Sequence, residues 1–125
     1  MESPENGIRL TVRIGYDGSV HKTFRGADAG KRFGNEQRVL KFLEKQDCPF
    51  VPQVLEAHED QQRLVTTNCG DAVERLGEKE TQEIFDELER DYRVRHGDPC
   101  LRNLTYSPHL NRFCVINFEE AELLV

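Results

Sequence analysis

Two short stretches near the end of the chain constrain its fold most strongly, because the polar side chains that they contain are expected to meet. Residues 94–104 read VRHGDPCLRNL, and residues 115–119, which follow a short hairpin, read VINFE. Asp98 lies on a tight loop between glycine and proline, an amide follows five positions later, and a third polar group follows the next strand. The oxygens of Asp98, Asn103 and Asn117 are therefore expected to converge, in a geometry suited to a metal-bound phosphate.

The N-terminal part of the sequence predicts a β-hairpin. Apolar and polar residues alternate over residues 8–14, which is the period of a half-buried strand, with the apolar face formed by Ile8, Leu10, Val12 and Ile14. Residues 15–19 provide turn chemistry, and residues 20–24 alternate again. On this second strand Lys22 shares a face with two apolar residues. A buried ammonium is costly unless it is paired, so Lys22 needs an anionic partner.

The helix predicted next supplies that partner. It runs from a cap at Asp28 to about Lys45. Its apolar stripe contains Phe33, Leu40 and Leu43, and Glu36 falls on the same stripe, so we expect a Lys22–Glu36 ion pair. The alternative is a Lys22 that reaches out to solvent and a Glu36 at the rim of the core. Together with the loop at residues 94–104, the paired arrangement is favoured.

The remaining elements follow in a simple order. Residues 53–58 and 63–67 predict a second hairpin, and residues 66–70 a connector of small and polar residues. From residue 71 the chain has helical character that Gly77 interrupts, with a second helix over residues 79–93. A third hairpin, residues 104–106 and 113–116, brings Asn117 back toward Asn103.

This order of features resembles the protein-kinase-like superfamily, whose catalytic loop reads H-x-D-x-x-x-x-N and whose metal-binding turn reads D-F-x. The His-Gly-Asp form is similar to that of aminoglycoside and choline phosphotransferases and RIO-type kinases. The resemblance covers nearly the whole chain. It implies an α+β, truncated kinase-like single domain over residues 1–125: an N-lobe-like small antiparallel sheet plus helix (1–67), a hinge-like connector (68–70) and a reduced helical C-lobe (71–125).

The resemblance also implies roles for individual residues. Lys22 contacts the phosphates of ATP and Glu36 holds Lys22, Asp98 is the catalytic base, and Asn103 and Asn117 bind Mg²⁺. Two features depart from the family pattern. Asn117 stands where the family has a metal-binding Asp, and the glycines at 15 and 18 fall in the turn between the strands, so no glycine-rich cover precedes the Lys22 strand.

Two functions of different classes therefore follow. The first is ATP- and Mg²⁺-dependent phosphoryl transfer to a hydroxyl acceptor. The second is a catalytically impaired pseudokinase, acting as an interaction or regulatory module on a partner protein or as a homodimer. A third alternative is a small α+β domain whose match to the superfamily is accidental.

Charge and composition exclude other classes. The formal net charge of -6 argues against a general nucleic-acid or membrane-surface binder. No run approaches the roughly 18 apolar residues of a membrane helix, and no targeting signal is evident, so a cytoplasmic protein is expected. The cysteines lack metal-ligand spacing and predict small buried or half-buried thiols. His96 is expected to brace its loop by hydrogen bonds rather than to act as an acid or metal ligand.

Overall fold

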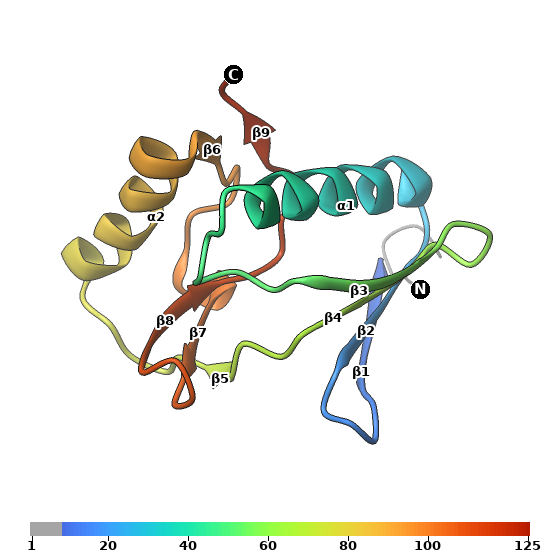
Figure 1. Cartoon of the computed structure of the whole chain (residues 1–125), viewed down its shortest axis with the longest axis horizontal. Coiled ribbons are helices and arrows are strands. Elements are labelled where there is room, and N and C mark those ends of the chain that lie inside the picture. The colour runs from blue at the N-terminus through green and yellow to red at the C-terminus, as the bar shows by residue number, and fades with distance from the viewer. Residues whose placement is uncertain (1–8) are drawn as a thin grey trace, which may run out of the picture.

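The computed structural model describes residues 9–125, which form an α+β fold with two α-helices and three small antiparallel sheets (Figure 1). The first sheet has the strand order β1-β2-β4-β3, with β1 (Leu10–Ile14), β2 (Val20–Phe24), β3 (Val54–His58) and β4 (Arg63–Thr66). The second has the order β5-β7-β8, with β5 (Asp71–Ala72), β7 (Leu104–Ser107) and β8 (Arg112–Val115). The third pairs β6 (Val94–Arg95) with β9 (Glu122–Leu123).

Helix α1 (Ala29–Lys45) runs along the first sheet and helix α2 (Glu78–Tyr92) stands at the other end of the molecule, beyond β7 and β8 (Figure 1). The three hairpins, α1 and α2 all confirm the sequence predictions to within one or two residues. A 3₁₀ turn, η2 (Leu101–Asn103), links the loop after β6 to β7. The order of elements thus delivers the His96–Asp98 loop between α2 and the last hairpin, as the sequence predicts.

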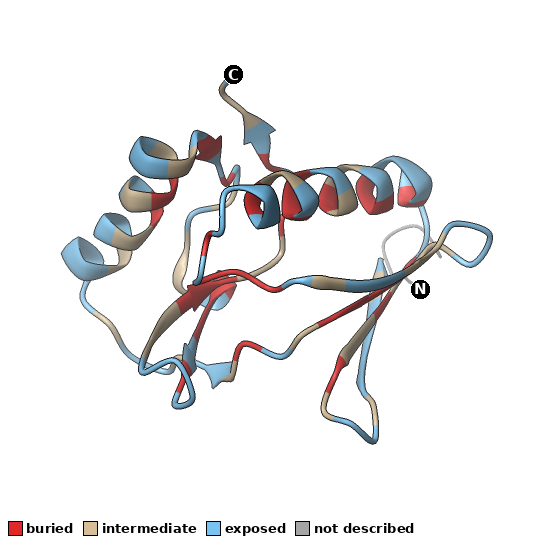
Figure 2. Cartoon of the chain, viewed as in Figure 1, coloured by how far each residue is buried: buried red, intermediate tan, exposed pale blue. Residues whose placement is uncertain are grey.

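One continuous hydrophobic cluster connects α1, the first sheet, α2 and the β7–β8 hairpin. Figure 2 shows that the buried residues of α1 face the sheets beneath it. Phe33 and Phe24 meet edge to face with their ring centroids 6.0 Å apart. The largest fully buried apolar side chains of the cluster are Phe24, Phe50, Phe118, Leu40, Leu43, Leu64, Leu88 and Leu104. Because Phe118 belongs to this cluster, the segment 115–119, which contains Asn117, is anchored in the core.

The segment after the connector differs from its prediction. Residues 71–76 form no helix: Asp71 and Ala72 make strand β5, which pairs with Tyr106 and Thr105 of β7. Gly70 turns the chain here at a φ of 95°, and a side chain on it would overlap the Tyr106 carbonyl oxygen. Pairing with an available strand edge therefore takes the place of a helix of only six residues, which is too short to be stable on its own.

Two further expectations at the N-terminal end need correction. The sequence predicts that the apolar face of β1 packs on the core, but Val12 and Ile14 are each 55% exposed. The reason is that β1 is an edge strand with no layer packed on that face. Ile8, which the sequence assigns to the same face, lies outside the described residues. Asp28 does occupy the N-cap position of α1, but its φ is 57° and its side chain makes no capping hydrogen bond. Its carbonyl oxygen instead accepts a hydrogen bond from the Arg32 amide.

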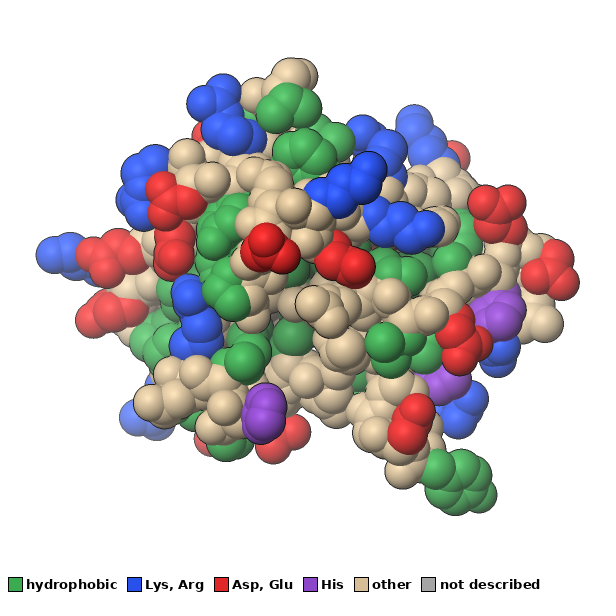
Figure 3. Space-filling model, viewed as in Figure 1, with side chains coloured by type: hydrophobic (Ala, Val, Ile, Leu, Met, Phe, Trp, Pro, Cys, Tyr) green, Lys and Arg blue, Asp and Glu red, His purple; other side chains and the backbone are tan. Residues whose placement is uncertain are grey.

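The surface mixes both signs of charge. On the face drawn in Figure 3, Lys and Arg side chains gather over α1 with acidic side chains beside them. A surface cavity beside the N-terminal half of α1 has both signs of charge in its lining, which includes Arg9, Lys31, Arg38, Glu119 and Glu120. Neither helix within residues 9–125 has the length and hydrophobicity needed to cross a membrane.

Candidate functional site

The predicted ion pair between β2 and α1 is present and buried. The Lys22 Nζ lies 2.6 Å from the Glu36 Oε1, and the two residues are only 5% and 1% exposed. The Lys22 ammonium also lies 5.5 Å from the centre of the Phe24 ring. Because a buried charge without a partner is strongly unfavourable, each member of this pair offsets the free-energy cost of burying the other.

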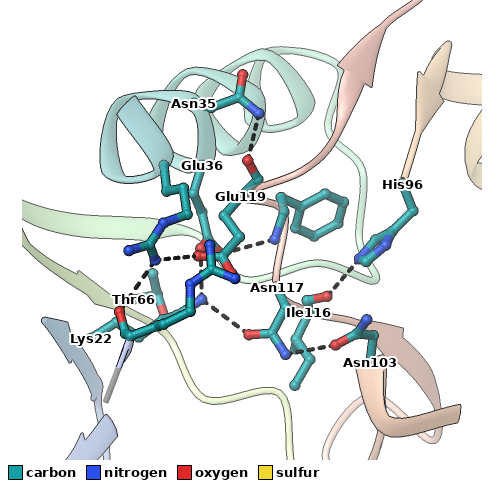
Figure 4. Close-up of polar contacts among 12 residues, drawn as sticks. Lys22, Asn35, Glu36, Thr66, His96, Asn103, Ile116, Asn117 and Glu119 are labelled. Carbon is teal, nitrogen blue, oxygen red and sulfur yellow. Dashed lines mark hydrogen bonds and ion pairs between the residues drawn. The ribbon is translucent and has the colours of Figure 1, made fainter. Parts of the chain in front are cut away.

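Helix α1 also fixes the segment that contains Asn117. The second carboxylate oxygen of Glu36 accepts a hydrogen bond from the Phe118 amide at 3.2 Å. The side-chain amide of Asn35 donates to the Glu119 carbonyl oxygen at 3.0 Å (Figure 4). It also donates to the Ala121 carbonyl oxygen at 2.9 Å. Arg32, which is 4% exposed, donates to the Glu119 carboxylate at 3.2 Å. Sequence reasoning did not identify Arg32 or Asn35. Arg32 lies four residues before Glu36, on the same face of the helix, and this spacing could have indicated it.

The five predicted site residues form one unbroken series of hydrogen bonds. Lys22, already bound to Glu36, donates to the Asn117 Oδ1 at 3.1 Å. The Asn117 Nδ2 donates to the Asn103 Oδ1 at 2.7 Å, and the Asn103 Nδ2 donates to the Asp98 Oδ2 at 3.0 Å. Figure 4 shows Asn117 between Lys22 and Asn103. We call this series the amide relay.

The chemistry at its two ends fixes the direction of the amide relay. An ammonium can only donate and an ionised carboxylate can only accept. Asn117 must therefore turn its oxygen to Lys22 and its nitrogen to Asn103, and Asn103 must turn its nitrogen to Asp98. An Asp at position 117 would place two acceptors opposite each other at the Asn103 oxygen. The backbone also suits asparagine, because Asn117 has a φ of 65°, a conformation that asparagine adopts more readily than most residues.

His96 braces the loop, as expected. It is 3% exposed, and its ring lies 5.1 Å, centroid to centroid, from both Phe85 and Phe118. Its Nε2 is 2.8 Å from the Ile116 carbonyl oxygen, and its Nδ1 accepts from the Asp98 amide at 3.2 Å. These partners require the neutral ring with its proton on Nε2. Burial lowers the pKa of His96 from its usual 6.5, against the raising effect of the bond to Ile116.

This lowered pKa predicts a loss of stability in mild acid. Because the unfolded chain binds the proton more readily, the contribution of His96 to the free energy of unfolding is complete above about pH 6.5 and is lost as the pH falls below it, toward the lower pKa of the folded state. NMR titration of the His96 ring in the folded protein checks this prediction. A His96 signal that titrates at or above pH 6.5 would contradict the buried, neutral assignment.

Asp98 is held as an anion by its own loop. Its carboxylate lies 2.6 Å from Arg102, and Cys100 donates to it at 3.5 Å. Partial burial opposes ionisation, but the hydrogen bonds from Asn103 and Cys100 and the charge of Arg102 leave the pKa of Asp98 below its usual value. Asp98 is thus a carboxylate at neutral pH whose oxygens are already engaged. Cys100 contacts Asp98 rather than His96, and the other three cysteines are free and buried, as expected.

Two cavities meet at Asn117. The first, which we call the cleft, has a volume of about 370 Å³ and reaches from strands β1 and β2 to the connector, with Lys22 and Asn117 among its lining residues. That volume lies within the range of roughly 300 to 1,000 Å³ of small-molecule sites. The second, the Asp98 cavity, has about 490 Å³ and is lined by Asp98, Asn103, Asn117 and charged neighbours. Lys22 lines only the cleft and Asp98 only the second cavity.

The residues around Asn117 do not fit a Mg²⁺ ion. Mg²⁺ in proteins is bound by carboxylates and phosphate oxygens in octahedral geometry. Here both amide oxygens of the amide relay accept hydrogen bonds, and its two carboxylates, Glu36 and Asp98, are paired with Lys22 and Arg102. Within residues 9–125 no three His, Cys, Asp or Glu side chains gather in a group that could hold a metal. The predicted metal ligands thus lie together, but they satisfy one another.

No protein-family model matches the sequence, and no curated protein matches it significantly.

Proposed function

We propose that this chain is a kinase-like module that binds a nucleotide in the cleft, is impaired in phosphoryl transfer, and acts through binding. The observation that carries the proposal is the amide relay: Lys22 and Asp98, the two charged groups that transfer needs, are joined by Asn117 and Asn103 rather than by a metal site. Phosphoryl transfer depends on charge stabilisation at the phosphates, so an arrangement without metal ligands favours binding over turnover.

The order and placement of elements support the kinase-like part of the proposal. A strand lysine pairs with a helix glutamate, a connector leads to a second half with one α-helix and two small sheets, and an H-G-D-x-x-x-x-N loop meets N-F-E beside that lysine. Residues 1–67 then act as an N-lobe, residues 68–70 as a hinge and residues 71–125 as a reduced C-lobe. As a binding module the protein works in the cytoplasm, on a partner protein or a second copy of this chain.

The cleft supports nucleotide binding by its composition. Its walls are mostly apolar, Lys22 lies at its polar end, and the connector borders it with backbone groups. A flat base can pack against apolar walls while backbone groups and a few polar side chains orient it. The walls include Leu10, Val12, Ile14, Val20, Cys69, Ala72 and Ile116. This role explains why β1 exposes Val12 and Ile14: they face a ligand space rather than a core.

Thermal unfolding with adenosine, AMP and ATP tests the proposal. A ligand that binds only the folded state raises the melting temperature, by several degrees for a domain of this size at about 100 times its Kd. Ala72→Phe places a ring in the cleft from the exposed strand β5 and is expected to remove most of that rise. The matched control is Ala27→Phe, on an exposed loop residue outside the cleft. A full rise in Ala72→Phe, or no rise with any of the three ligands in the wild type, would contradict the proposal.

The Asp98 cavity favours a second candidate, phosphoryl transfer to a hydroxyl acceptor. In that reaction the acceptor oxygen attacks the γ-phosphorus, the bond to ADP breaks, and Asp98 takes the hydroxyl proton. The supporting observation is that Asp98 is ionised and lines a cavity that adjoins the cleft at Asn117. Formation of ADP by the wild type, abolished in Asp98→Asn, would replace the binding-only proposal with this one.

A further inference from the structure

We infer that the cleft takes a nucleobase-bearing ligand of low charge, a nucleoside or nucleoside monophosphate, and holds it without a metal ion. This inference rests on the proposed function and names the ligand class of the same site. It follows from three observations: the charge of the two cavities, the closed amide relay and the apolar walls of the cleft.

Acidic side chains outnumber basic ones around the two cavities. The acidic lining residues are Glu36, Asp71, Asp98, Glu119 and Glu120, and the basic ones are Lys22, Arg9 and Arg102. Lys22 is neutralised by Glu36 at 2.6 Å, and Arg102 by Asp98 at the same distance. Glu119 is likewise paired with Arg32 at 3.2 Å, which leaves Asp71 and Glu120 against Arg9. A triphosphate that extends from the cleft toward Asp98 therefore meets a slight excess of negative charge, with both Lys22 and Arg102 already paired.

A bound divalent cation is the usual way to offset such repulsion, and the amide relay leaves it no ligands. A metal ion on the Asn117 oxygen would lie beside the Lys22 ammonium, which donates to that same oxygen at 3.1 Å, and the Asn103 oxygen already accepts from Asn117 at 2.7 Å. The two positive charges would repel each other, and moving Lys22 away from Asn117 would leave it with Glu36 as its remaining partner, which is costly. Each added phosphate therefore increases the repulsion without recruiting a compensating ion.

The apolar walls supply attraction that does not depend on charge. Val12 and Ile14 are each 55% exposed and line the cleft with Val20 and Ile116. Burying a base and sugar against these side chains removes apolar surface from water, and Lys22 remains as the one cation facing a single phosphate. The binding determinants thus favour the nucleoside part of the ligand.

Calorimetric titration with adenosine, AMP and ATP, each in EDTA and in excess Mg²⁺, tests the inference. The wild type is expected to bind adenosine and AMP with Kd values that agree within about twofold between the two buffers, and ATP about fivefold or more weakly. Tighter binding of ATP with Mg²⁺ than of AMP would overturn the inference and leave the proposed function intact. No binding of any of the three ligands would overturn both.

The variant Asn117→Asp tests whether restoring a carboxylate at this position makes nucleotide binding depend on Mg²⁺. The added carboxylate places a second acidic group beside Asn103, on the side away from Asp98, and provides a charged oxygen ligand for a metal. Mg²⁺ is therefore expected to improve ATP binding about tenfold or more over EDTA. The matched control is Asn111→Asp, because Asn111 also has a positive φ, 54°, but lies exposed in the β7–β8 turn. Mg²⁺-dependence in both variants, or in neither, would show that Asn117 does not set the metal requirement.

Discussion

A Glu36→Gln variant is expected to lose about 3 to 5 kcal/mol of its free energy of unfolding, the cost of leaving a buried charge without its partner. Glutamine carries no charge to offset the Lys22 ammonium, which now lies 2.6 Å from a carboxylate oxygen in a site that is 1% exposed at Glu36. If its amide oxygen accepts from Lys22, its amide nitrogen faces the Phe118 N–H, which now donates to the second carboxylate oxygen at 3.2 Å. Urea denaturation measures the loss as a lower midpoint with an unchanged slope.

Two control variants show whether the loss of stability comes from burial of the ion pair or from the Glu→Gln substitution itself. Glu89→Gln removes a carboxylate that pairs with Arg95 at 2.9 Å on the exposed side of α2, and no measurable loss is expected. The double variant Lys22→Met/Glu36→Gln removes the stranded charge and should recover most of the stability lost in Glu36→Gln. Equal, small losses at Glu36 and Glu89, or a double variant less stable than Glu36→Gln, would contradict a buried and mutually dependent pair.

Gly97→Ala is expected to destabilise the fold by about 2 to 4 kcal/mol, through backbone strain and steric overlap. Gly97 has a φ of 90°, and a Cβ there would overlap the carbonyl oxygen of Glu120. The glycine of the His-Gly-Asp stretch is therefore required by the close approach of the chain segment after Phe118, and the substitution would separate the Asp98 loop from that segment.

Gly34→Ala is the matched control for Gly97→Ala. Gly34 lies inside α1, and a Cβ on it meets no atom within 4 Å. Alanine loses less backbone freedom on folding than glycine, so this variant should be more stable than the wild type by about 0.5 to 1 kcal/mol. Thermal and urea unfolding of both variants give the comparison. A Gly97→Ala protein as stable as the wild type would contradict the described path of the loop.

The sequence was sufficient to predict contacts that depend on local periodicity. Strand alternation turned Lys22 inward and helix spacing turned Glu36 to the same side, and the two meet at 2.6 Å. Hairpin reversal likewise brought Asn117 within 2.7 Å of Asn103. In each case the period of an element decides which side chains face the core, and a short connection limits where they can lie.

Features that depend on tertiary pairing could not be predicted in this way. Strand β5 has two exposed residues and exists only because β7 offers an edge. Arg32 is buried among backbone carbonyls, such as those of Arg25 and Ala27, that no sequence pattern marks as acceptors. The hydrogen bonds of Asn103 and Asn117 could not be predicted either. Side-chain identity indicated oxygen ligands for a metal, whereas the contacts with Lys22 and Asp98 engage both ends of each amide.

Diffraction at the manganese absorption edge, from crystals soaked with a non-hydrolysable ATP analogue and Mn²⁺, tests most directly whether this site works without a metal. If the amide relay stays closed, the base is seen in the cleft and no anomalous peak lies within coordinating distance of Asn103 or Asn117. A Mn²⁺ ion bound by both amide oxygens and the nucleotide phosphates would contradict it, and would restore a metal-dependent site to this chain.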